Sequence, residues 1–132
     1  MLGLFFNKKK LLTDRKALGH WGEKHAEKHL KNKGFKTLAR NFLCNRGELD
    51  LVMADKDGTI VFVEVKTRTG EDFTLIENVL TKPKKESLWR AARYFLETNN
   101  ITERPFRFDF VAIVLDQNAK ETLKHYENAF IP

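Results

Sequence analysis

The sequence predicts a single α/β domain in which helices flank a central mixed β-sheet. Three observations lead to this prediction. The 132 residues suit one domain with a modest core, and a composition of 42% hydrophobic and 32% charged residues is typical of a soluble globular protein. The expected elements follow in the order helix, three strands, helix, strand and a final strand, which is typical of an α/β fold. No internal repeat or low-complexity linker divides the chain.

The N-terminal segment and the overall charge narrow the class of protein. Residues 1–13 are interpreted as a flexible basic arm ahead of a domain spanning 14–132. The apolar run in this arm is too short for a membrane span or a signal peptide. The net charge of +6 favours a polyanionic partner, and would attract nucleic acid or an anionic membrane surface equally. Cys44 is the only cysteine, which excludes an intramolecular disulfide and fits a reducing cytoplasm.

The first predicted element is a helix over residues 14–33, with Asp14 as its cap and Gly34 as its stop signal. One face of this helix carries mostly small residues at three- and four-residue spacings: Gly19, Gly22, Glu23, Ala26 and Leu30. Small residues let a helix approach a sheet closely, which would bring Glu23 toward Asp50 of a following strand. The alternative for Glu23 is an ordinary solvent-exposed glutamate.

Three strands are expected next, at 35–43, 48–54 and 59–67. The third is the most hydrophobic segment of the chain and is apolar on both faces up to Val63, which predicts a central strand covered on both sides. Glu64 and Lys66 then emerge on a face that is core until that point. Charges on a core face are costly unless they are paired, hydrogen-bonded or bound to a metal. A structural Glu–Lys pair and a functional site are both open at this stage.

The turn between the second and third strands determines which residues face each other. A two-residue turn of Asp57 and Gly58 would place Asp50 and Glu64 opposite apolar residues. A three-residue loop over 56–58, with Gly58 left-handed, places Asp50 directly across from Glu64. This register pairs Val52 with Phe62 and Ala54 with Ile60 on one face, and Leu49, Leu51 and Met53 with Val65, Val63 and Val61 on the other. Because a one-residue slip inverts every side chain, this hydrophobic matching favours the second register.

In that register two carboxylates lie side by side on a half-buried face. The Cβ atoms of Asp50 and Glu64 would be roughly 5 Å apart. Like charges this close repel each other unless one is protonated or a cation binds. Mg²⁺ takes one or two protein carboxylates, keeps several waters and accepts phosphate oxygens, and Lys66 on the same face can reach a water or a phosphate oxygen. The set predicts metal-assisted phosphodiester hydrolysis; the alternative is a buried ion network without a metal.

The second half of the chain supplies the remaining elements. Residues 68–80 show no clear period and are expected to form a loop near the site. Thr81 predicts the cap of a helix over 81–98, whose buried stripe is Leu88, Ala92, Phe95 and Leu96. Two strands complete the chain, at 106–115 and 122–128. Arg107 and Asp109, two positions apart on the first of these strands, fit a structural pair and are kept outside the candidate site.

Asp50, followed on the next strand by Glu64-Val65-Lys66, resembles the PD-(D/E)XK signature of restriction-endonuclease-like nucleases. The wider sequence is similar to the YraN family of small bacterial endonuclease-like proteins, which resemble archaeal Holliday-junction resolvases. The matching stretches are Gly19-His20-Trp21-Gly22-Glu23 with Ala26 and Leu30, Arg40-Asn41, Arg46-Gly47-Glu48-Leu49-Asp50-Leu51, Phe62-Val63-Glu64-Val65-Lys66-Thr67-Arg68, Thr81 with Lys84, and Arg107-Phe108-Asp109. Two positions depart from the pattern. Leu49 replaces the signature proline, as is usual for YraN-like sequences, and Leu43 stands where the family commonly has an arginine.

The resemblance implies a restriction-endonuclease-like fold and a metal-dependent endonuclease, a hydrolase acting on DNA that is branched or structured. Asp50 and Glu64 would bind Mg²⁺ or Mn²⁺. Lys66 would orient the attacking water or stabilise the transition state, and Glu23 would be a further acid of the site. By analogy with resolvases, the resemblance also implies a homodimer. The alternative is a nucleic-acid-binding or adaptor module on the same fold that does not cleave.

Four further residues are candidates for contacts with a nucleic-acid backbone: Arg46, Arg68, Lys84 and Asn41. Arg68 lies on the face of Glu64 if the strand stays regular. Lys84 stands at the start of the second helix, where backbone amides favour an anion. Asn41 and Arg46 contact phosphate in this interpretation, or alternatively organise the loop that leads to Asp50.

Overall fold

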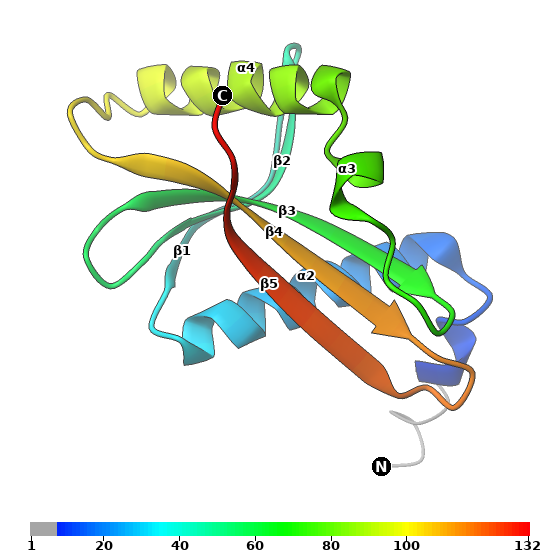
Figure 1. Cartoon of the computed structure of the whole chain (residues 1–132). Coiled ribbons are helices and arrows are strands. Elements are labelled where there is room, and N and C mark those ends of the chain that lie inside the picture. Colours follow the sequence, from blue (N-terminus) through cyan, green and yellow to red (C-terminus); the bar gives the residue numbers. More distant parts are fainter. Residues whose placement is uncertain (1–7) are drawn as a thin grey trace.

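The computed structural model describes residues 8–132, and a mixed five-stranded sheet of order β1-β2-β3-β4-β5 lies at its centre (Figure 1). Its elements are α2 (Arg15–Asn32), β1 (Lys36–Cys44), β2 (Gly47–Ala54), β3 (Ile60–Thr69), α3 (Ile76–Val79), α4 (Lys82–Thr98), β4 (Phe106–Leu115) and β5 (Glu121–Phe130). β3 and β4 pair in parallel, and the other neighbouring strands are antiparallel. The predicted α/β domain with a mixed sheet is confirmed.

Two long helices cover opposite faces of the sheet and determine from which side a helical residue can reach it (Figure 1). α4 lies in the connection between the parallel strands and packs on the face that carries Val52 and Phe62. Its buried residues are Leu88, Ala91, Ala92 and Phe95. α2 packs Ala26 and Leu30 against the other face, which carries Val63. β3 is therefore covered on both sides, as its apolar residues on both faces predict.

The ends of both long helices follow their sequence signals. Asp14 Oδ1 accepts a hydrogen bond from Ala17 N at 3.0 Å and caps α2. Gly34 has a φ of 98°, a left-handed conformation that favours glycine, and the chain leaves α2 there to enter β1. Thr81 Oγ1 accepts a hydrogen bond from Lys84 N at 3.4 Å and caps α4. Both predicted caps are confirmed.

The hairpin between β2 and β3 has the predicted register. The pairs are Ala54 with Ile60, Met53 with Val61, Val52 with Phe62 and Leu51 with Val63. Asp55 N donates to the carbonyl oxygen of Thr59 at 3.0 Å, and Gly58 has a φ of 91°, as expected for the three-residue loop. The next residues along the two strands, beyond the last pair, are Asp50 and Glu64.

Leu49 is the exception to the predicted facing of β2. It belongs to the apolar cluster under α4, although strict alternation would put it on the same face as Leu51, under α2. The ladder with β3 ends at Leu51, and Asn41 on the neighbouring strand β1 is left-handed, with a φ of 49°. Before Leu51 the chain follows β1 alone, through the pair of Leu49 with Phe42, and Leu49 turns toward α4. The predicted facing of Leu49 is therefore wrong.

The N-terminal boundary of the packed domain lies earlier in the chain than the predicted residue 14. Residues 8–10 are helical, and Leu11 is buried against Leu18 and Leu115. This apolar contact joins residues 8–13 to the domain, whereas residues 1–7 of the predicted arm lie outside the described residues. Within the part that the structure describes, no helix is long and apolar enough to cross a membrane.

Candidate active site

Three acidic side chains from three different elements come together: Glu23 of α2, Asp50 of β2 and Glu64 of β3. We call these three residues the acidic site. Asp50 is their common neighbour, because its carboxylate interacts with Glu23 and with Glu64. Asp50 Oδ2 also accepts a hydrogen bond from Val65 N at 2.8 Å, which holds the carboxylate where the β2–β3 ladder ends. The structure thus brings three of the four predicted catalytic residues together.

Glu64 is more deeply buried than Glu23, because its side chain is 11% exposed and that of Glu23 is 22% exposed. The pKa of Glu64 is raised to about 8, first by burial and then by the neighbouring Asp50 carboxylate. Lys84 opposes the shift, since its Nζ lies 2.8 Å from Glu64 Oε2. Near neutral pH the site therefore favours a proton, or another cation, on Glu64.

Glu23 experiences the same two effects to a smaller extent. The pKa of Glu23 is raised to about 7, first by burial, then by the Asp50 carboxylate and last by Glu48. His20 Nδ1 lies 3.9 Å from Glu23 Oε1. A carboxyl group with a pKa near 7 can give up or accept a proton at physiological pH, which suits a group that acts in acid–base chemistry.

The close approach of α2 to β3 depends on one glycine. A Cβ atom at Gly22 would lie 1.8 Å from Thr67 Oγ1, so the helix can sit here only without a side chain at this position. Gly19, which the sequence groups on the same small-residue face, has open space where a Cβ atom would lie and is not required for the contact. Gly22, together with the buried Ala26 one turn further on, therefore allows the closeness that brings Glu23 to Asp50.

The donors of Asp50 and Glu64 fit a divalent cation. Adjacent carboxylates repel each other, and a cation between them relieves that repulsion. Mg²⁺ commonly takes only one or two protein carboxylates and completes its shell with water. Within residues 8–132, no group of three His, Cys, Asp or Glu side chains is arranged to hold a metal ion. An ion at Asp50 and Glu64 would keep most of its shell for water or substrate oxygens, as expected of a catalytic ion.

Two lysines lie near the acidic site, and they differ in their partners. Lys84 pairs with Glu64 at 2.8 Å. Lys66 lines a small cavity with Phe73 and Ala112, and it makes no hydrogen bond or ion pair with any residue in the described range. The alternative of a closed ion network among Asp50, Glu64 and Lys66 therefore lacks its lysine contact.

A cavity of about 300 Å³ opens beside the acidic site. Its lining residues are His20, Glu23, Lys24, Glu27, Arg40, Asn41, Asp50 and Leu51. Arg40 Nη2 lies 2.7 Å from Glu27 Oε2, and this pair forms one wall. The hydrogen bond from Arg40 lowers the pKa of Glu27, so this acid stays charged and belongs to the wall, in contrast to Glu23. Asn41, which is predicted to contact the nucleic-acid backbone, also lines this cavity.

The other predicted nucleic-acid contacts lie at separate places. Arg46 stacks over the ring of Tyr94, with 5.6 Å between the guanidinium carbon and the ring centroid. Arg68 is exposed near the end of β3 and lines a second cavity, of about 280 Å³. Leu43, which replaces the family's arginine, is 76% exposed. Of the four candidates, Asn41 and Lys84 adjoin the acidic site.

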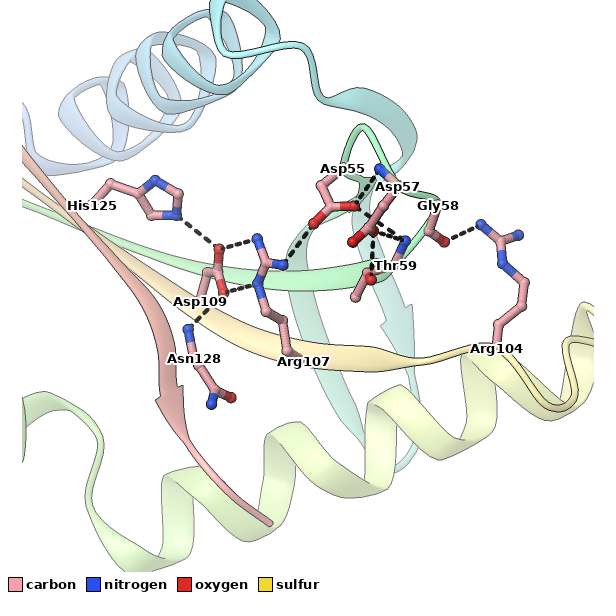
Figure 2. Close-up of polar contacts among 9 residues, drawn as sticks. All are labelled: Asp55, Asp57, Gly58, Thr59, Arg104, Arg107, Asp109, His125 and Asn128. Atoms are coloured by element: carbon pink, nitrogen blue, oxygen red, sulfur yellow. Dashed lines mark hydrogen bonds and ion pairs between the residues drawn. The ribbon is translucent and has the colours of Figure 1, made fainter.

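Arg107 and Asp109 belong to a different polar cluster, which we call the Asp109 network: Asp55, Arg107, Asp109, His125 and Asn128 (Figure 2). Arg107 Nε donates to Asp109 Oδ1 at 2.9 Å, and its Nη1 donates to Asp55 Oδ2 at 2.6 Å. Asn128 N donates to Asp109 Oδ1 at 3.0 Å. These bonds join the β2–β3 hairpin to β4 and β5. The structural pairing of Arg107 with Asp109 is confirmed.

The tautomer of His125 follows from its two partners. Lys33 Nζ lies 2.9 Å from His125 Nδ1, and an ammonium group only donates, so Nδ1 accepts. The ring proton is then on Nε2, which donates to Asp109 Oδ2 at 2.8 Å. Every partner in this cluster is therefore matched as donor to acceptor.

The contacts of Lys84 with Glu64 and of Arg40 with Glu27 were outside the sequence prediction. One local signal pointed to the second contact: Glu23 and Glu27 are one helical turn apart and share a face, so a cavity beside one of them includes the other. No local signal indicated the first, because it depends on how α4 packs on the sheet.

The comparisons with known proteins agree with the resemblance that the motifs carry. The family model described as "Uncharacterised protein family UPF0102" matches residues 22–113. A UPF0102 protein of Pelotomaculum thermopropionicum is 43% identical over 117 residues, covering 88% of this chain and 97% of the relative. A UPF0102 protein of Clostridium acetobutylicum is 40% identical over 116 residues, covering 87% of this chain and 94% of the relative.

Two solved structures are similar over part of their length. One is described as an EndoMS–dsDNA2 complex; it is 22% identical, has a TM-score of 0.33, and the match covers 64% of this chain and 42% of that one. The other is Pyrococcus furiosus SfsA in complex with Ca²⁺, which is 16% identical with a TM-score of 0.38 over 86% of this chain and 64% of that one.

Proposed function

Since the chain belongs to the uncharacterised protein family UPF0102, whose name states no activity, we propose its function from the acidic site. The protein is a metal-dependent endonuclease that hydrolyses phosphodiester bonds in DNA, with branched or structured DNA as its substrate. The observation that carries this proposal is the β2–β3 register that brings Asp50 to Glu64, with Glu23 beside them. The net charge of +6 supports a polyanionic substrate.

Asp50 and Glu64 would hold Mg²⁺ or Mn²⁺. The bound ion would supply Lewis acidity for activating water and for stabilising charge that develops on phosphorus. The hydrogen bond from Val65 N fixes the Asp50 carboxylate beside Glu23 and Glu64, where it would bind the ion. Glu64 is shielded from bulk water by its burial, and electrostatic interactions are stronger in such surroundings.

The remaining residues of the site would move a proton and hold the substrate. Glu23, with its pKa of about 7, would accept a proton from the attacking water. Lys66, on the same strand as Glu64, would orient that water or stabilise the charge of the transition state. Asn41, Arg46, Arg68 and Lys84 would contact the phosphate backbone and position it without reading its sequence.

Two further parts of the proposal follow from the substrate. A cytoplasmic location fits a DNA substrate and the single cysteine, Cys44. A homodimer would present two acidic sites, one for each of the two equivalent strands of a DNA junction.

The proposal is tested by incubating purified protein with branched, single-stranded and linear DNA in Mg²⁺, Mn²⁺ or EDTA. Cleavage is expected with either ion and not with EDTA. Asp50→Asn should lower the rate by about 100-fold or more, the usual effect of removing one electrostatic element of a catalytic site. Glu97→Gln, which changes an exposed acid at the far end of α4, is the matched control and should cleave normally.

Cleavage that persists in EDTA or in Asp50→Asn would reject the proposed mechanism. Salt-dependent binding without cleavage under every condition would instead establish the non-cleaving nucleic-acid-binding module. Binding itself should survive in Asp50→Asn, because phosphate contacts supply most of the affinity.

A further inference from the structure

Lys84 is placed unlike an ordinary surface lysine. It lies in the first turn of α4, on a helix whose register against the sheet is fixed by Leu88, one turn further on, and by Ala91. From there its side chain extends from the helix to the strand, so that Nζ lies 2.8 Å from Glu64 Oε2. Its side chain is 35% exposed, so Lys84 is only partly buried where it meets Glu64.

The charges that act on Lys84 are the carboxylates that would attract a divalent cation to the acidic site. Burial lowers the pKa of Lys84, but Glu64, and beyond it Asp50 and Glu48, raise the pKa by more. Lys84 is therefore surrounded by carboxylates on the side of the sheet where the acidic site needs positive charge. Lys66, in contrast, has no ion pair within the described part of the chain; it lines a small, mainly apolar cavity and also the cavity of about 280 Å³ that Arg68 lines.

We propose that Lys84 is an exchangeable counter-cation of the acidic site: it neutralises Glu64 in the ion-free protein, yields that oxygen to a divalent cation, and then binds a phosphate oxygen of the substrate. This inference rests on the proposed function. The role of Lys84 depends on whether a divalent cation is bound, and Lys66, which has no contact with Glu64 among the described residues, does not share it. A carboxylate oxygen that accepts an ammonium at 2.8 Å has limited room for a second cation, so the two compete for Glu64. The released ammonium stays within reach of the site because its stem is anchored in α4.

The first test measures cation binding in the absence of nucleic acid. Ca²⁺ is titrated calorimetrically into full-length protein at alkaline pH, above the pKa of about 8 of Glu64, so that protons do not compete. Lys84→Met keeps the apolar stem and removes the competing charge, and it should tighten Ca²⁺ binding by about fivefold, the upper end for a partly exposed ion pair. Lys82→Met, on the same helical turn but exposed and without a contact to Glu64, is the matched control for charge and should change it far less.

The second test measures binding of a branched DNA duplex in EDTA and in Ca²⁺, at the same alkaline pH as the first test, where Glu64 is ionised and pairs with Lys84. Lys84→Met should weaken binding by about two- to fivefold in Ca²⁺, where the ammonium is free, and leave it unchanged in EDTA, where Glu64 holds it. The salt dependence of binding should fall by about one phosphate contact, again only in Ca²⁺. Glu64→Gln releases Lys84 without any ion, so it should tighten DNA binding in EDTA, and Glu64→Gln/Lys84→Met should abolish that gain.

Equal Ca²⁺ affinities for Lys84→Met and Lys82→Met would overturn the inference, and so would a loss of DNA binding that is the same with and without Ca²⁺. Neither readout requires cleavage. A protein that cleaves DNA but fails these two tests keeps the proposed function and loses this role of Lys84; a protein that passes them but never cleaves keeps the exchange and loses the nuclease. Lys84→Arg, which retains the charge, should behave like wild type in EDTA if the pairing with Glu64 is ionic.

Discussion

The acidic site and the Asp109 network both bury carboxyl groups in the same sheet, yet their pKa values shift in opposite directions. Burial works against the charged form of Asp109, but hydrogen bonds from His125 and its other partners outweigh burial, and the pKa of Asp109 lies below its ordinary value. In the acidic site burial is reinforced by the neighbouring Asp50 carboxylate, and the pKa rises to about 7 for Glu23 and to about 8 for Glu64.

The difference follows from the supply of donors. Asp109 accepts hydrogen bonds from a guanidinium, an imidazole and a backbone amide, so its charge is fully compensated within the protein. Asp50 accepts one bond, from Val65 N, and faces two other acids. A cluster that is complete by itself stabilises the fold, whereas carboxylates short of donors indicate a site that is completed from outside.

Removing the central acid of each cluster should separate these roles most clearly. Asp109→Ala leaves the buried His125 without the acceptor of its Nε2 and leaves Arg107 with Asp55 as its remaining acid, and should lower the free energy of unfolding by about 3–5 kcal/mol. Asp50→Ala removes one of several repelling carboxylates and should change stability by less than about 1 kcal/mol while abolishing cleavage. Urea denaturation and a cleavage assay on the same samples check both outcomes. Similar losses of stability in the two variants would contradict the comparison.

A divalent cation should stabilise the protein through the acidic site alone. At about 100 times the dissociation constant of Mg²⁺ or Mn²⁺, the gain is expected to be about 2.7 kcal/mol, and it should vanish on adding EDTA. Asp50→Asn should lose this gain, because it removes one of the two proposed ligands. Asp57→Asn, in the β2–β3 loop, should retain it. Thermal melting with and without the ion measures the effect, and a gain that survives in Asp50→Asn would place the ion elsewhere.

The two clusters should also give opposite limbs of the pH–stability profile. The pKa of Glu64 rises from 4.5 to about 8 on folding, so its contribution is greatest below pH 4.5 and is lost as the pH rises toward 8. The pKa of Asp109 is lowered from 3.8, so its contribution is present above that pH and is lost on further acidification.

Glu64→Gln should reduce the alkaline limb of this profile and leave the smaller part that Glu23, with its pKa of about 7, contributes. The gain at pH values above the pKa of Glu64 should be about 1 kcal/mol or more, since the variant removes a buried charge. The acid limb should remain. Urea denaturation across the pH range provides the measurement. An alkaline limb that is unchanged in Glu64→Gln would show that another group causes it.

The smallest expected effect distinguishes an exposed arginine from one inside the Asp109 network. Arg68 is exposed near the end of β3, and Arg68→Ala should weaken DNA binding by about two- to fivefold, reduce the salt slope by about one contact, and leave stability within about 0.5 kcal/mol. Arg107→Ala should instead lower stability, because Asp109 stays buried without its main cation. Filter binding at several salt concentrations, with denaturation alongside, measures both. A loss of stability in Arg68→Ala would argue against a substrate contact.

Much of the fold and the closeness of Asp50 to Glu64 could be predicted because they depend on local rules. The alternation of apolar residues fixed the register of β2 against β3, and Asp14 and Thr81 are caps whose side chains bond within three residues. The pair of Arg107 with Asp109 is also local, at two positions along one strand.

The remainder depends on tertiary packing, which no local pattern encodes. Lys84 reaches Glu64 only because α4 docks on the sheet at one particular position. His125 and Asp55 join the Asp109 network from other strands and from a hairpin, far away in the sequence. Leu49 departs from alternation because the ladder to β3 stops at Leu51, and the sequence does not mark that end.

The size of the side chain at position 22 controls how closely Glu23 approaches Asp50. Thr67 Oγ1, only 1.8 Å from where a Cβ would be, is itself buried and has no hydrogen-bond partner within the described residues. A larger side chain at residue 22 would push α2 away from β3, and the adjacent Glu23 would move with the helix. Alanine, serine and valine at position 22 would therefore move the Glu23 carboxylate away from Asp50 by increasing amounts, without changing any of the three acids.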